Sequence, residues 1–136
     1  MDYAVKAALA DPSAGEFVLD RQRTMYGGKL IAVGDAVFVF DSETSGGAGL
    51  CARGVAKAVA AVPLVPGVAR QVPLVNLTIR REAVVRRRLL RAEVRGFADW
   101  GDGRPQTELN FKFYRQATDK LVGISPELAG FLAEYF

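Results

Sequence analysis

The fold of this chain is decided by IAVGDAVFVF, residues 31–40. In this stretch a Gly-Asp turn precedes a run of β-branched and aromatic residues, which is a strong signal for a strand. The strand is expected to end at Asp41 and Ser42, where a loop of small polar residues begins. A second run of β-branched residues follows at 50–62. Together the two runs predict a hairpin with a long connection.

Strand signals continue on both sides of this hairpin. Residues 109–114 alternate between apolar and polar side chains in the way that a half-buried strand does. Residues 17–19 fit either a short strand or one turn of helix. The polar, basic residues 21–29 are expected to form a loop, in which Gly27 and Gly28 let the backbone come close to another segment. The remaining strands are expected at residues 3–8, 71–80 and 120–124.

Two helices are expected in the second half of the chain. Ser125 supplies an N-cap and Pro126 a first helical residue, and an apolar stripe follows as far as Tyr135. In residues 82–92 helix and strand compete, and the spacing of the apolar residues favours a helix with arginines outside. Six or seven short strands, a turn at 100–105 and these helices predict an α+β fold, a mixed β-barrel.

Length and composition indicate one ordinary globular domain spanning residues 1–136. Half of the residues are hydrophobic and 24% are charged, as in a soluble protein. The most apolar stretch, 54–69, is interrupted by Lys57, Pro63 and Pro66, so it is too short for a membrane helix. The beginning of the chain does not resemble a secretory signal. No membrane association and a cytoplasmic location are therefore expected.

The chain contains no histidine and one cysteine, Cys51. Histidine is the commonest metal ligand and the commonest acid or base at neutral pH, and a single cysteine makes no internal disulfide. Zinc sites with histidine, Ser-His-Asp triads and Cys-His pairs are thereby excluded. We therefore expect that the protein is not an enzyme and that it binds neither a metal nor another cofactor.

Arginine is concentrated in residues 80–95, which contain seven arginines and two glutamates and therefore a local net charge of +5. Such a basic patch attracts phosphate backbones, although a merely solvated face has the same composition. The candidates for phosphate contacts, here and elsewhere, are Arg21, Arg23, Lys29, Arg86, Arg87, Arg88, Arg91 and Arg115.

Several segments, in this order, resemble the EVE domain family of the PUA-like superfamily, which also includes the ASCH and YTH domains. Tyr3-Ala4-Val5-Lys6 is similar to that family's opening strand, and residues 31–40 followed by Ser42 are similar to its strand with a Gly-Asp start. Residues 54–59 resemble the return strand, and residues 113–127 the last strands before a C-terminal helix. The chain departs from the family in its loop at 21–29, where Tyr26 stands in place of tryptophan.

The resemblance implies a PUA-like barrel that holds a modified, flipped or unpaired nucleobase, such as 5-methylcytosine, in an aromatic cleft. The carrier would be DNA or RNA, and relatives often act beside a partner nuclease or another effector. Stacking of bases on aromatic rings and recognition of base edges by polar groups are physical effects that do not depend on the family. The candidates for base binding are Tyr26, Asp41, Ser42, Trp100, Asn110, Tyr114, Gln116 and Thr118.

Two alternatives remain open at this point. The first is an ASCH-like ribonuclease, in which Lys6, Lys112, Tyr114 and Arg115 would form the catalytic group, because a buried lysine can have its pKa lowered enough to act as a base. The second is a module that binds a protein or a small metabolite. Salt dependence separates a nucleic-acid interface from an apolar one.

Overall fold

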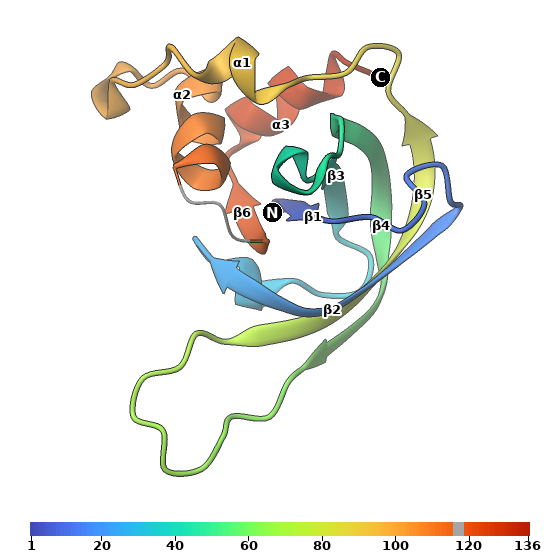
Figure 1. The fold of residues 1–136 in the computed structure, drawn as a ribbon, viewed down its shortest axis with the longest axis vertical. Helices are drawn as coiled ribbons and strands as arrows, with labels where there is room; N and C mark the ends of the chain where they lie inside the picture. Colours follow the sequence, from blue (N-terminus) through green and yellow to red (C-terminus); the bar gives the residue numbers. More distant parts are fainter. Residues whose placement is uncertain (116–118) are drawn as a thin grey trace.

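The computed structural model describes residues 1–115 and 119–136. In this part of the chain six strands close into a mixed barrel with the order β1-β3-β4-β5-β2-β6 (Figure 1). The strands are β1 Asp2–Ala7, β2 Glu16–Met25, β3 Ala36–Asp41, β4 Gly49–Ala61, β5 Leu74–Val84 and β6 Lys120–Ile124. β1 is parallel to β3 and β2 to β6, whereas the other neighbours are antiparallel. The predicted barrel and the predicted β3–β4 hairpin are confirmed.

β3 is apolar from Ala36 to Phe40 because both of its faces are buried there. Successive side chains of a strand point to opposite faces. Val37 and Val39 therefore lie inside the barrel, whereas Phe38 and Phe40 lie on its outer face. That outer face is covered by helices, so both sets of side chains are buried.

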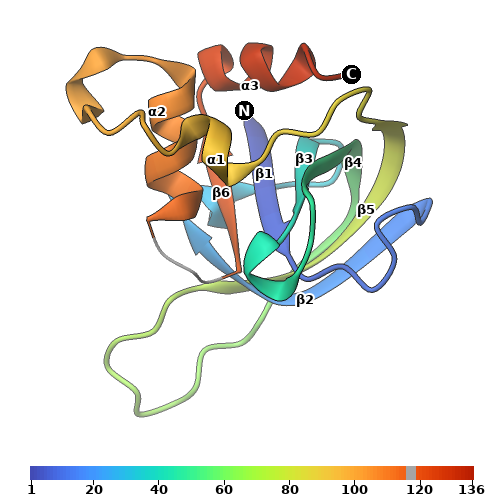
Figure 2. The ribbon, with the colours of Figure 1, turned by 45° about the horizontal axis from the view of Figure 1, so that its top comes forward.

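The helices form one layer over β1, β3 and β6 (Figure 2). They are α1 Arg91–Val94, α2 Pro105–Leu109 with a π-helical continuation Asn110–Tyr114, and α3 Pro126–Ala133. α3 begins as predicted, because Ser125 Oγ accepts a hydrogen bond from the Leu128 amide at 3.0 Å. None of the described helices is long and apolar enough to cross a bilayer.

The predicted strand at residues 109–114 is wrong, since this segment is helical. Leu109 and Phe113 lie four positions apart and therefore fit a helical stripe as well as an alternating one. Pro105 occupies the first helical turn, where its missing amide hydrogen is not needed. Asn110 and Tyr114 complete the buried stripe and leave Phe111 half-buried.

The predicted helix at residues 82–92 is also wrong. β5 continues to Val84, which pairs with Ala52 of β4, and the Val85 amide donates to the Cys51 carbonyl. Branched side chains favour this extended pairing. The chain then crosses to the helical layer without regular structure, and helix forms only at α1, over four residues.

The predicted loop at residues 21–29 is wrong for its first half, because β2 extends to Met25. Gln22 and Thr24 point inward, and their polarity conceals the alternation of a strand. A β-bulge separates Leu19 from Gln22, and the Asn76 side chain accepts the bulged Arg21 amide at 2.8 Å.

Gly28 makes the close approach that the paired glycines predicted. A Cβ at this position would lie 2.2 Å from the Leu121 carbonyl oxygen of β6. We expect Gly28→Ala to lower the free energy of unfolding by about 1–3 kcal/mol, because backbone must move to admit the methyl group. Urea unfolding measures this. Gly15→Ala is the matched control, since no atom lies within 4 Å there, and an equal loss in both variants would contradict the expectation.

Candidate nucleic-acid interface

Two exposed aromatic rings line one pocket of about 520 Å³. This volume is typical of sites for small molecules. Tyr26 comes from the turn after β2, and Trp100 from a 3₁₀ turn before α2. Their side chains are 48% and 57% exposed, so their faces are open to a ligand. The other lining residues are Asp102, Gly103, Arg104, Thr107, Glu108, Lys112, Ser125 and Glu127.

Tyr26 is held in an uncommon backbone conformation. Its φ of 52° lies in the left-handed region, which a bulky residue seldom adopts, and Gly27 continues the turn at φ 82°. The Tyr26 carbonyl accepts a hydrogen bond from the Gly123 amide of β6 at 3.2 Å. Such strain is often retained at functional sites. Here the turn fixes the ring at the mouth of the pocket.

Trp100 packs on a neighbouring aromatic ring. Its ring lies 4.9 Å from that of Phe111, centroid to centroid, and Asp99 Oδ1 accepts the Gly101 amide within the same turn. The Arg115 guanidinium lies 4.7 Å from the centre of the Phe111 ring. Trp100 is therefore positioned by packing and still presents a free surface.

Lys112 and Glu108 form the polar wall of the pocket. Lys112 Nζ donates to Glu108 Oε2 at 2.9 Å and to the Gly123 carbonyl at 2.7 Å, and it lies 5.0 Å from the centre of the Tyr26 ring. Ser125 donates to Glu108 through both its amide and its hydroxyl. Burial by itself would raise the pKa of Glu108, but these hydrogen bonds outweigh burial and lower it. The wall therefore presents a fixed charge pair.

A second polar cluster lies under the helical layer, around two buried lysines. Lys6 and Lys120 are opposed in the β1–β6 register and are 4% and 1% exposed. Lys6 Nζ donates to the Phe113 carbonyl at 2.6 Å and lies 5.5 Å from the centre of the Tyr114 ring. Burial and the charge of Lys6 lower the pKa of Lys120 to about 8.

Tyr114 belongs to this cluster and not to the pocket of Tyr26 and Trp100. Its side chain is buried, and burial raises the pKa of its phenol. Among the described residues its hydroxyl has no hydrogen-bond partner. Arg91 donates to the Tyr114 carbonyl at 3.2 Å, and its own amide donates to Glu43 at 2.7 Å.

The other predicted base-binding residues that the structure describes lie apart from the pocket. Asp41 is buried and its Oδ1 accepts the Leu9 amide, while Ser42 is buried at the end of β3. Asn110 is buried at the start of the π-helical continuation of α2 and donates to the Phe97 carbonyl at 3.0 Å. Gln116 and Thr118 lie outside the described residues.

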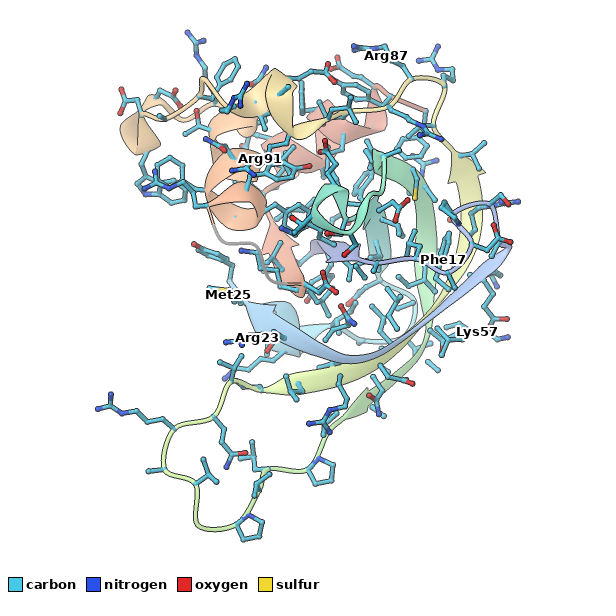
Figure 3. All side chains as sticks on the ribbon, in the orientation of Figure 1. Phe17, Arg23, Met25, Lys57, Arg87 and Arg91 are labelled. Carbon is cyan, nitrogen blue, oxygen red and sulfur yellow. The ribbon has the colours of Figure 1, made fainter. Side chains whose placement is uncertain are left out.

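Six of the eight predicted phosphate contacts fall into two separate groups, while Arg91 and Arg115 contact the Tyr114 carbonyl and the Phe111 ring. Arg23 lies near Met25 on β2, well below Arg87 in the view of Figure 3. Arg21 and Lys29 belong to the same stretch of chain as Arg23 and are exposed like it. In the other group, Arg86 donates to the Glu134 carbonyl, while Arg87 pairs with Glu93 and lies 4.5 Å from the centre of the Tyr135 ring. Arg88 follows them in the exposed connection.

Sequence reasoning missed Arg104, Glu108, Ser125 and Lys120. A helix at residues 105–114 would have placed Glu108 and Lys112 one turn apart, at the spacing of an ion pair. Lys120 gives no such signal, because only the strand register brings it to Lys6. No group of three acidic or cysteine side chains able to hold a metal ion is found among the described residues.

Comparison with known proteins identifies the fold. No protein-family model and no curated protein matches the chain. The crystal structure of the DUF55 domain of human thymocyte nuclear protein 1 is similar, with a TM-score of 0.67 and 12% sequence identity. The match covers 98% of this chain and 97% of that one. The chain therefore has the PUA-like fold of the DUF55 domain, as the resemblance implied, and at this identity the comparison shows the fold alone.

Proposed function

We propose that this domain binds nucleic acid and accommodates one unpaired or flipped base in the pocket between Tyr26 and Trp100. One observation carries the proposal: two half-exposed aromatic side chains from distant parts of the sequence line the same pocket. Stacking a base on an aromatic ring contributes about 1–3 kcal/mol. The pocket volume is sufficient for a base.

The polar lining supports recognition of base edges. Lys112 donates and Glu108 accepts hydrogen bonds, and Arg104 is a further lining residue with a guanidinium group. Donors and acceptors at fixed positions discriminate between bases, because a mismatched edge leaves buried polar groups unpaired. A modified cytosine, such as 5-methylcytosine, is the ligand that we propose to test first.

The cations of β2 support contacts with the phosphate backbone. Arg21 and Arg23 precede Tyr26 on the strand that leads to the pocket, and Lys29 follows it. Contacts of this kind position a nucleic acid without reading its sequence. Arg86 and Arg87, in contrast, contact Glu134 and Tyr135 after α3. These contacts favour a structural role for the two arginines.

We further propose that the domain is cytoplasmic, not an enzyme, and recruits a separate effector such as a nuclease. Cys51 is buried, and burial raises the pKa of its thiol to about 11, so it is a poor nucleophile at neutral pH.

A binding screen tests the proposed function. Oligonucleotides with cytosine, 5-methylcytosine or 5-hydroxymethylcytosine at one position, and an RNA control, are titrated at several salt concentrations. We expect binding that weakens steeply with salt and differs between the bases. Binding that is absent, or that does not depend on salt, would refute the proposal.

The double variant Arg21→Glu/Arg23→Glu is expected to weaken binding to every oligonucleotide by a similar factor and to reduce the salt slope by about 2, because two phosphate contacts are lost. Arg86→Glu/Arg88→Glu is the matched control on the exposed connection after β5, and we expect it to have a smaller effect. The salt dependence of the dissociation constant measures both. A larger effect of the control would mean that the phosphate backbone of the nucleic acid binds at Arg86 and Arg88 instead.

The buried lysines favour one second candidate, an RNA-cleaving activity. Lys120 has its pKa lowered to about 8 and lies across the strand pair from Lys6, whose Nζ is 5.5 Å from the centre of the Tyr114 ring. An amine able to accept a proton is therefore present near neutral pH. Lys112, in contrast, is engaged with Glu108. Cleavage of labelled RNA that is lost in Lys120→Met would support this activity, and the absence of cleavage in the unmodified protein would exclude it.

A further inference from the structure

Residues 62–73, called the β4–β5 arm below, project from the barrel between β4 and β5. Both ribbon views show this segment extending away from all other elements (Figures 1 and 2). Its apolar side chains are open to solvent: Leu64 is 64% exposed, Val65 58% and Val68 50%. A contiguous exposed apolar surface indicates a contact with another molecule.

The arm has a defined conformation. Its tip is a turn with Pro66 and Gly67 at the central positions, a φ of 82° at the glycine, and a hydrogen bond from the Val68 amide to the Val65 carbonyl. The Gln71 side chain closes the arm with hydrogen bonds to the Val65 amide at 2.8 Å, to the Val65 carbonyl at 2.7 Å and to the Val68 carbonyl at 3.0 Å. A preformed arm loses little conformational entropy when it binds.

The root of the arm lies directly beside the turn that carries Tyr26. The Pro73 carbonyl accepts hydrogen bonds from the Thr24 amide at 3.1 Å and from the Thr24 hydroxyl at 2.7 Å. Pro73 also lines a small cavity of about 210 Å³ together with Tyr26 and Lys29. The arm and the aromatic pocket are therefore neighbouring parts of one surface.

The charges around the arm favour a polyanion as its partner. Residues 20–30 and 59–76 contain four cations, Arg21, Arg23, Lys29 and Arg70, and one acid, Asp20, which gives a net charge of +3. Arg23 pairs with Leu74, the residue at which the arm rejoins β5. Proteins that separate stacked base pairs combine apolar side chains, which enter between the bases, with positively charged residues that contact the phosphates.

We propose that the β4–β5 arm is a wedge that enters a nucleic-acid duplex beside the base held by Tyr26 and Trp100. The inference rests on the proposed function and assigns a part of the fold to the flipping of a base out of a duplex. Removing a base from a duplex costs a few kcal/mol of stacking and pairing, and an apolar side chain that fills the vacated space offsets part of this cost. Leu64 and Val65 would occupy the space, and Arg23 and Arg70 would hold the flanking phosphates.

The test compares the same oligonucleotide as a single strand and as a duplex, both with 2-aminopurine beside the test base. We expect the unmodified protein to raise 2-aminopurine fluorescence in the duplex. The double variant Leu64→Ser/Val65→Ser should lose duplex affinity by about tenfold or more, while its affinity for the single strand stays within about twofold. Gln71→Ala, which loosens the arm, should act in the same direction with a smaller effect.

Val84→Ser is the matched control, because Val84 is also an exposed apolar residue but lies at the end of β5 that is distant from the arm. It should change neither affinity. The wedge is refuted if the arm variants weaken binding to the single strand and to the duplex equally, or if they weaken binding to neither. Both outcomes leave the proposed base pocket standing. If the unmodified protein binds neither form, the proposed function itself fails.

Discussion

Replacing both Tyr26 and Trp100 by alanine is expected to reduce the affinity for single-stranded nucleic acid by roughly 100-fold, because each stacking interaction contributes about 1–3 kcal/mol. Both side chains are half-exposed, so their removal should change the melting temperature little. Fluorescence anisotropy of a labelled oligonucleotide measures the affinity.

The double variant Tyr26→Phe/Trp100→Phe is the control for this effect. It keeps an aromatic face at both positions and should bind within a few-fold of the unmodified protein. Equal losses in the alanine and phenylalanine variants would mean that the phenol and indole polar groups, and not the ring faces, carry the binding. No loss in either variant would place the base elsewhere.

Lys120→Met should stabilise the protein at pH 7 by about 1–3 kcal/mol, because methionine fills the site without a buried charge. The pKa of Lys120 is lowered from 10.5 to about 8 in the folded protein. Between these pH values the unfolded chain binds a proton that the folded chain lacks, so this lysine makes the folded state more stable as pH rises from about 8 to about 10.5. Denaturant unfolding of both proteins across this range measures the difference.

The advantage of Lys120→Met over the unmodified protein should therefore shrink as pH rises through this window. Taking the difference between the two proteins removes the contributions of Cys51 and Tyr3, whose pKa values are raised by burial. Lys112→Met is the matched control and should destabilise, because Lys112 is bonded to Glu108 and to the Gly123 carbonyl. A difference between Lys120→Met and the unmodified protein that is constant with pH would contradict the account.

Local signals were sufficient for the strands of the barrel other than β2, and for α3. The Gly-Asp turn before residues 36–41 and the Ser125-Pro126 cap each specify structure over a few residues, and both were confirmed. Residues 109–114 were ambiguous because their apolar positions fit both the period of a strand and that of a helix. β2 was concealed by the inward polar side chains of Gln22 and Thr24.

The candidate site could be predicted only in part. Tyr26 and Trp100 were selected because each adjoins a glycine-rich or polar loop, and the structure places both in one pocket. Nothing in the sequence shows that these two loops meet, since β6 and α2 bring them together. The opposition of Lys6 and Lys120 likewise depends on the β1–β6 register, which the sequence does not specify.

Trp100 is the only tryptophan of the chain, so its intrinsic fluorescence reports directly on the pocket. The most direct test of the central claim is to titrate the protein with single-stranded oligonucleotides while this fluorescence and the anisotropy of the oligonucleotide are recorded together. Our account predicts that stacking quenches Trp100, that the quenching saturates at the concentration where anisotropy does, and that Tyr26→Ala weakens both signals. Binding detected by anisotropy without any change in Trp100 fluorescence would contradict it.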